Sequence, residues 1–388
     1  MNRPARARYR AALVGGGVVG LFTAYHLARA GAGPIVVVDR GFPSAGASGR
    51  NGGGVRQQWE TAATVRLARE SVAAWRRFGR EFGFNIWFRP GGYLFLAGAP
   101  GELARLAEVH RVVTGEGLPA ELLDRDGVAR HADGLSLDGV VGGTFLASDG
   151  TLYPFPVLWG LTEALRSLGV ELLYGVEATG LRVEDGCVVG LATTAGPIDA
   201  PAVVNAAGGW SAEFTRRAGL TAFNEARRHE ILATEPLKPF LDPMVVRLSD
   251  GLYFSQTMRG EIVGGLTVPH PPGTAGGMSS SPEFLVRMAR ALTGLVPRVR
   301  GLGILRAWSG YYDENPDGLP SIGEDPRRPG LYHANGFGGH GFMLAPASTR
   351  RVAQSVLGER TDLDPAQFHP GRFLDAHRAA PAEGLTLG

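Results

Sequence analysis

Three glycines near the start of the chain have the spacing of a pyrophosphate-binding turn. Gly15, Gly17 and Gly20 follow a short apolar run and precede a segment of helical periodicity. In such a turn the first glycine permits a tight bend, the second lets the backbone approach phosphate oxygens, and the third lets the helix pack on the strand. The start of the helix, at Val18 and Val19, offers N–H groups and a positive dipole to an anion. The spacing therefore predicts a dinucleotide site.

An acidic residue ends the next predicted strand, residues 34–39. Asp39 follows the glycines by about twenty residues, the place where a ribose hydroxyl needs an acceptor. A carboxylate there disfavours a 2′-phosphate, so FAD or NAD is expected rather than NADP. The residues of this strand–helix–strand unit do not distinguish FAD from NAD.

Length and composition limit the class of protein. The chain has 388 residues, 44% of them hydrophobic, and a formal net charge of +2. It can form two domains or one large composite domain, and it has no basic bias that would indicate nucleic acid. Its single cysteine, Cys187, excludes an intramolecular disulfide and is expected to be buried or next to a turn. We expect a cytoplasmic protein with no metal site and no membrane span.

Hydrophobic periodicity predicts the remaining elements. A glycine-rich loop over residues 41–56 is followed by helices at 57–82, 102–116, 154–168 and 282–295, and by a last helix that ends at Leu357. Strands are predicted at 92–96, 170–174, 228–234, 252–257 and 261–267. The runs 175–184, 188–194 and 198–206 predict an antiparallel meander that returns to the main sheet.

Four separated segments together resemble the FAD-dependent D-amino-acid oxidase superfamily, in its sarcosine oxidase, glycine oxidase and proline dehydrogenase branch. They are the glycine turn with Asp39, residues 47–56, residues 204–211, and the glycine-rich stretch from 306 to 342. The first segment is generic, and the last two are specific.

The resemblance implies an α/β fold with an α+β substrate part. A discontinuous, Rossmann-like FAD-binding domain would comprise residues 1–85, 145–220 and 320–388, and a β-sheet substrate domain would comprise 86–144 and 221–319. FAD is favoured over NAD. The residues implied to contact it are Gly15, Gly17, Val18, Val19, Gly20, Asp39, Arg40, Ser48, Gly49, Asn51, Gly52, Gly53, Val176, Ala206, Ala207, Gly208, Trp210, Gly336, Gly338, Gly339, His340, Gly341, Phe342 and Met343.

The implied reaction is oxidation of a small amino acid, or of an N-methyl or cyclic one, to an imine by hydride transfer to flavin N5. A sarcosine oxidase-like enzyme is the expected form. Arg56 would bind the substrate carboxylate, and Tyr253 would lie on the substrate side. His340 belongs to the glycine loop whose N–H groups would stabilise the reduced flavin. Lys238, the only lysine, would assist oxygen reduction.

Alternatives remain open for these residues. Arg56 could instead neutralise phosphate or lie at the surface, Tyr253 could be a core aromatic, and Lys238 could be an exposed loop residue. Tyr311 and Tyr312 could wall the substrate pocket or pack beneath a sheet.

The chain differs from the enzymes it resembles at positions that in those enzymes bind the flavin or the substrate carboxylate. Gly310 stands where monomeric sarcosine oxidases tether flavin through a cysteine, so non-covalent FAD is expected. Met343 replaces a carboxylate-binding lysine, and Tyr311 with Tyr312 replace a carboxylate-binding arginine. The electron acceptor would be O2, a protein or a quinone. The alternative function is a beta-type subunit of a multi-subunit amino-acid or opine dehydrogenase that passes electrons to a partner.

Overall fold

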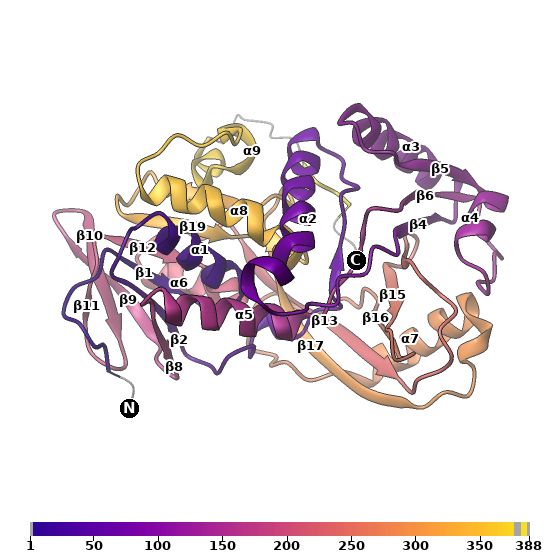
Figure 1. Cartoon of the computed structure of the whole chain (residues 1–388), viewed down its shortest axis with the longest axis horizontal. Helices are drawn as coiled ribbons and strands as arrows, with labels where there is room; N and C mark the ends of the chain where they lie inside the picture. The colour runs from indigo at the N-terminus through magenta and orange to yellow at the C-terminus, as the bar shows by residue number, and fades with distance from the viewer. Residues whose placement is uncertain (1–2, 376–381, 386–388) are drawn as a thin grey trace.

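The computed structural model describes residues 3–375 and 382–385. Two large sheets organise this part of the chain, one on the left of Figure 1 with α1 and α8, and one on the right with α7. The helices are α1 Val18–Arg29, α2 Ala62–Phe82, α3 Pro100–Gly115, α4 Arg125–His131, α5 Pro154–Ser167, α6 Ser211–Arg217, α7 Pro282–Leu295, α8 Gly341–Val356 and α9 Pro365–Phe368. The mixed α/β class is confirmed.

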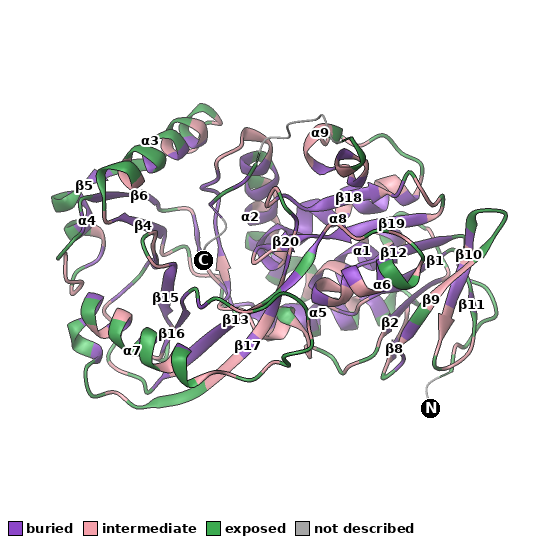
Figure 2. Ribbon diagram, turned by 180° about the vertical axis from the view of Figure 1, so that it is seen from behind, coloured by how far each residue is buried: buried purple, intermediate pink, exposed green. Residues whose placement is uncertain are grey.

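The first sheet has the order β18-β19-β12-β1-β2-β8. All neighbouring pairs are parallel except β18 with β19. Its strands read as continuous apolar runs because helices cover the sheet, and Figure 2 shows its centre buried. The strands are β1 Ala11–Val14, β2 Ile35–Asp39, β8 Glu171–Tyr174, β12 Ala202–Asn205, β18 Ser321–Glu324 and β19 Leu331–Asn335.

The second sheet has the order β20-β17-β13-β16-β15-β14-β4-β6-β5. Its longest pair, β13 with β17, is antiparallel. The strands are β4 Tyr93–Ala97, β5 Glu121–Asp124, β6 Gly142–Leu146, β13 Glu225–Thr234, β14 Met244–Arg247, β15 Leu252–Gln256, β16 Ile262–Gly265, β17 Ile304–Glu314 and β20 Phe337–Gly338.

Two small sheets complete the described fold. The meander is antiparallel, with β9 Ala178–Glu184, β10 Cys187–Thr193 and β11 Ile198–Asp199, and the chain then returns to the first sheet at β12. Cys187 is exposed and directly follows the turn at Gly186. The other small sheet pairs β3 Gly54–Val55 with β7 Gly150–Thr151.

The helix predicted from Gln57 begins five residues later, at Ala62. Gln57 donates its backbone and side-chain N–H groups to the buried Asp149 carboxylate, at 2.9 and 3.0 Å. Thr61 then caps the helix, because its hydroxyl accepts from the N–H of Thr64. The buried carboxylate therefore holds residues 57–58 outside the helix, which periodicity could not reveal.

The sheets do not test the predicted domain boundaries, but the residue range of each strand can be compared with the predicted domain ranges. Strands of the first sheet fall within the FAD-binding ranges. In the second sheet, the end of β6 and all of β20 fall outside the substrate-domain ranges. The strands that were not predicted are β3, β5, β6, β7, β14, β17, β18 and β20.

Candidate active site

A cavity of about 540 Å³ runs from the glycine turn of β1 to one face of the second sheet. The turn is shaped by close backbone approaches. Gly15 has a φ of +112°, and a Cβ on it would lie 2.3 Å from the carbonyl oxygen of Ala206. A Cβ on Gly20 would lie 1.9 Å from the carbonyl oxygen of Gly15. A side chain at Gly15 would require the ends of β1 and β12 to move apart, and one at Gly20 would require β1 and α1 to separate.

Side chains from two loops fix the edges of this turn. The Asp39 carboxylate accepts from the backbone N–H groups of Gly16 and Gly41, each at 2.7 Å. The Ser48 hydroxyl accepts from the N–H of Val18 at 2.9 Å, at the start of α1. The helix N-terminus and the carboxylate therefore line one wall together, as a pyrophosphate and a ribose require.

The opposite wall at this end is aromatic and charged. The Arg40 guanidinium lies 4.5 Å from the ring centroid of Trp210. Arg217 forms ion pairs with Glu177 at 2.8 Å and with Glu213 at 2.6 Å, and all three residues line the cavity. A flat heterocycle beside Trp210 would be held by stacking rather than by a fixed charge.

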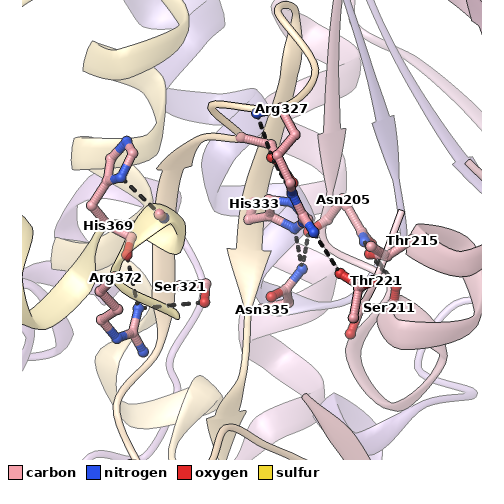
Figure 3. A network of polar contacts seen from close by, with 12 residues as sticks. Asn205, Ser211, Thr215, Thr221, Ser321, Arg327, His333, Asn335, His369 and Arg372 are labelled. Carbon is pink, nitrogen blue, oxygen red and sulfur yellow. Dashed lines mark hydrogen bonds and ion pairs between the residues drawn. The ribbon is translucent and has the colours of Figure 1, made fainter. Parts of the chain in front are cut away.

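A polar network holds the carboxyl ends of β12 and β19 beneath the cavity (Figure 3). Asn205 donates to the carbonyl of Ser211 at 2.9 Å. Asn335, which lines the cavity, donates to Nδ1 of His333 at 2.9 Å, and Nε2 of His333 lies 3.0 Å from Asp325. These buried groups are satisfied by one another, so the two strand ends are held in place.

The glycine loop before α8 forms the wall nearest the second sheet. Gly338, Gly339 and Gly341 line the cavity, and a Cβ on Gly339 would lie 2.6 Å from the ring of Tyr312. Asp313 accepts from the N–H of Gly336 at 2.7 Å, and burial raises the pKa of this carboxyl to about 6. The loop can approach a planar ring closely because it carries no side chains at these points.

One face of the second sheet closes the cavity. Strand pairing puts Tyr253, Gly265, Ile231 and Trp308 in one row across four strands. Of these, Tyr253 and Ile231 line the cavity, together with His229, Met244, Met278 and Tyr312. A Cβ on Gly52 would lie 3.6 Å from Ile231 and 3.7 Å from Tyr253, so the loop before β3 passes directly beneath this face.

Two tyrosines and a histidine supply the polar groups of that face. The phenols of Tyr253 and Tyr312 lie next to each other, and burial raises the pKa of both. The His229 ring stacks on Tyr312 with centroids 3.7 Å apart. Both phenols therefore stay protonated and can donate to a substrate oxygen.

Arg56 lies behind the cavity wall instead of lining it. Its guanidinium is fully buried, lies 4.2 Å from the ring centroid of Trp59, and donates to Nε2 of His340 at 3.1 Å. Burial lowers the pKa of His340 well below its usual value, so its neutral Nε2 can accept this bond. Arg56 also donates to the backbone carbonyl of Leu385. The alternative that Arg56 lies at the surface is wrong.

The structure brings most of the expected cofactor residues to the cavity. Those that line it are Gly15, Gly17, Val18, Val19, Asp39, Arg40, Ser48, Asn51, Gly52, Gly53, Ala206, Ala207, Gly208, Trp210, Gly338, Gly339, Gly341, Phe342 and Met343. Those that do not are Gly20, Gly49, Val176, Gly336 and His340. Gly20 and Gly49 instead allow close backbone contacts, with Gly15 and Ser44.

Lys238 also lies away from the cavity. It occupies the loop between β13 and β14, where its carbonyl accepts from Nε2 of Gln256 at 3.4 Å. Sequence reasoning missed His229, Ile231, Met244, Met278 and Asp313 as lining residues. Strand alternation places His229 with Ile231, and Gly310 with Tyr312, on one face, and this signal could have found part of the set.

Comparison with known proteins agrees with this geometry. Residues 10–355 match the family model described as FAD dependent oxidoreductase (DAO). The chain belongs to this family. It is 30% identical over 374 residues to "Sarcosine oxidase subunit beta" of Rhizobium meliloti (strain 1021), which covers 95% of this chain and 89% of the relative.

Two solved structures of the family share the whole fold. L-proline dehydrogenase from P. horikoshii is 31% identical, with a TM-score of 0.88 over 95% of this chain and 98% of that chain. Glycine oxidase from Geobacillus kaustophilus is 26% identical, with a TM-score of 0.86 over 96% of this chain and 100% of that chain. The expected superfamily and branch are confirmed, and the protein is an FAD-dependent oxidoreductase.

The geometry of the cavity fits FAD. The glycine turn, Asp39 and the α1 N-terminus suit the ADP half, and the loop at Gly338–Gly341 beneath the second sheet suits a planar ring. Within residues 3–375 and 382–385, no helix is long and apolar enough to cross a membrane.

Proposed function

We propose that this flavoenzyme oxidises a small amino acid, primary, N-methylated or cyclic, at the carbon that carries the nitrogen. The observation that carries the proposal is the paired phenols of Tyr253 and Tyr312 on the sheet face that closes the cavity opposite the glycine loop. Relatives named as a sarcosine oxidase subunit, a glycine oxidase and a proline dehydrogenase support this substrate class.

The chain's residues would orient the substrate rather than exchange protons with it. Bound FAD would supply the chemistry, by taking up a hydride from the substrate. Tyr253 and Tyr312 would donate to a substrate oxygen, while Ile231, Met244 and Met278 would enclose its carbon skeleton. This apolar enclosure excludes water from the reacting carbon.

The bound FAD would be non-covalent. Gly310, which lines the cavity, has no side chain for a tether. Cys187 is exposed on the meander and does not line the cavity. The only cysteine of the chain therefore has no access to the ring of a flavin bound here.

A second candidate is a catalytic subunit that passes electrons to a partner protein instead of O2. Lys238, the only lysine, does not line the cavity, so no lysine ammonium is placed to assist oxygen reduction. The relative from Rhizobium meliloti is itself named as a beta subunit.

We propose a cytoplasmic location for either form, which fractionation of the source cells would test.

The two candidates differ in what reoxidises the flavin. Sarcosine, L-proline and glycine, with their D- or N-methyl analogues where these exist, should be added anaerobically to the yellow protein, followed by air. Bleaching with peroxide release supports the oxidase. Bleaching with slow reoxidation in air, accelerated by an artificial acceptor, supports the subunit.

A further inference from the structure

A short segment near the end of the chain covers Arg56. We name residues 382–385 the strap. The Leu385 side chain is fully buried in the core that contains α2 and α8, and the Leu385 carbonyl accepts from the Arg56 guanidinium. The strap therefore occupies the position beside this guanidinium.

Contacts on both sides hold the strap. The N–H of Glu383 donates to the carbonyl of Asp317 at 2.8 Å. The Glu60 carboxylate accepts from the N–H of Gly384 at 2.6 Å and from Nε of Arg105 at 2.5 Å. The Glu383 carboxylate in turn accepts from the N–H of Glu60 at 3.2 Å. The strap thus has its own hydrogen-bonded seat.

The seat also contains an unfavourable element. The carboxylates of Glu60 and Glu383 both lie at the strap, where each accepts a backbone hydrogen bond. Burial raises the pKa of Glu383 to about 7. The hydrogen bond from the Glu60 N–H and the positive charge of Arg56 oppose this rise, and the negative charge of Glu60 adds a smaller increase. A seat that contains two like charges binds less tightly than its number of hydrogen bonds suggests.

The Arg56 guanidinium can bind a carboxylate more strongly than it binds the Leu385 carbonyl. A guanidinium binds a carboxylate through two parallel, charge-assisted hydrogen bonds, whereas the Leu385 carbonyl is one neutral acceptor. Arg56 is also close to the cavity in the chain. Gly54, two residues earlier, lines it, and Gly339 and Gly341 line it on either side of His340.

We propose that the strap is an exchangeable occupant of Arg56. When the strap is seated, the Leu385 carbonyl takes the guanidinium. When the strap withdraws, the carboxylate of the substrate takes that place. The affinity for the substrate is then the intrinsic affinity reduced by the fraction of molecules whose strap is seated. The identity of the substrate rests on the proposed function, but the exchange does not.

The test measures binding of propionate, a carboxylate without an amine, to the FAD-loaded protein by the change in flavin absorbance. Leu385→Ala removes the buried anchor and leaves Arg56 intact. We expect its Kd for propionate to be about tenfold lower than that of the wild type. Leu295→Ala, an equally buried leucine on α7 in a different core cluster, is the matched control and should leave the Kd unchanged.

A second variant and a second measurement guard against misfolding. A chain that ends at Asp375 lacks the strap and should bind propionate at least as tightly as Leu385→Ala. In the wild type, saturating propionate should accelerate hydrogen exchange at the N–H groups of Glu383 and Gly384, which are bonded when the strap is seated. Arg56→Lys should weaken propionate binding in every background.

An unchanged or higher Kd in both strap variants, with flavin retained, overturns the proposal. So does hydrogen exchange of the strap that propionate leaves unaltered. Because propionate is not oxidised, these outcomes are separate from those of the substrate panel. Failure of every amino acid to reduce the flavin would reject the proposed function and leave the exchange intact.

Discussion

The phenols of Tyr253 on β15 and Tyr312 on β17 lie next to each other although their strands are not neighbours. Strands β13 and β16 lie between them, and the tyrosine rings extend across the sheet face. Gly265 on β16 makes this possible, because a Cβ there would lie 3.0 Å from the Tyr253 hydroxyl oxygen. The pair is therefore a product of sheet topology and of one glycine.

Replacing either hydroxyl should impair turnover without releasing the cofactor. We expect Tyr253→Phe and Tyr312→Phe each to lower kcat/KM by about 5- to 100-fold, since a lost hydrogen bond that leaves a buried partner unpaired costs about 1–3 kcal/mol. Steady-state kinetics of the FAD-loaded variants checks this. Tyr153→Phe, at an exposed tyrosine, is the control and should be neutral. Full activity of both variants would show that the phenols do not bind the substrate.

The glycine turn should not tolerate a single methyl group. In Gly20→Ala the new Cβ would lie 1.9 Å from the Gly15 carbonyl oxygen, so β1 and α1 must separate. We expect the ratio of bound FAD to protein, measured by absorbance after gel filtration, to fall about tenfold. Gly101→Ala on α3, where a Cβ meets nothing within 4 Å, should keep its FAD. Normal FAD content in Gly20→Ala would contradict this role for the turn.

Acid precipitation should release all the flavin into the supernatant. The reason is that Gly310 offers no tether and Cys187 does not line the cavity. Cys187→Ser should release the same amount. Yellow colour that stays with the washed pellet would show a covalent bond and contradict the non-covalent assignment.

Propionate binding should tighten as pH rises toward neutrality. The pKa of Glu383 is about 7 with the strap seated and returns toward its ordinary value of 4.5 when the strap withdraws. Seating of the strap therefore takes up a proton at Glu383 when the pH lies between 4.5 and about 7. The strap is held most tightly below pH 4.5, and it is held less tightly as the pH rises through about 7. We expect the Kd for propionate to fall about tenfold from pH 6 to pH 8.

The neighbours of Glu383 do not supply this change. Hydrogen bonds to Arg105 and to strap N–H groups lower the pKa of Glu60, and burial keeps His340 neutral. Asp317 is paired with Arg372. Glu383→Gln should therefore make the Kd for propionate independent of pH between pH 6 and pH 8. An equally steep profile in this variant would assign the change to another group.

The part of the site that could be predicted from sequence is the part built from local contacts. Gly15, Gly17 and Asp39 lie in one strand–helix–strand unit, so their spacing alone places them. The strap that covers Arg56 comes from residues 382–385, near the far end of the chain. No spacing near Arg56 carries a signal for it.

The substrate end was harder to predict because it depends on strand register. His229 and Tyr312 meet only because β13 pairs with β17 in one alignment, and a shift of either strand by one residue would turn its side chain away from the cavity. β17 was missed as a strand, so this relationship was not available. The late start of α2 has a similar cause, since Asp149 and Gln57 are far apart in the chain.

Anaerobic flavin reduction tests the central claim most directly. The FAD-loaded protein should be mixed without oxygen with sarcosine, L-proline, glycine and a panel of other D- and L-amino acids, and the absorbance of the oxidised flavin followed. The account predicts complete bleaching by at least one small amino acid, at a rate that Tyr253→Phe and Tyr312→Phe reduce. Flavin that stays oxidised with every member of the panel, yet is bleached by dithionite, would contradict it.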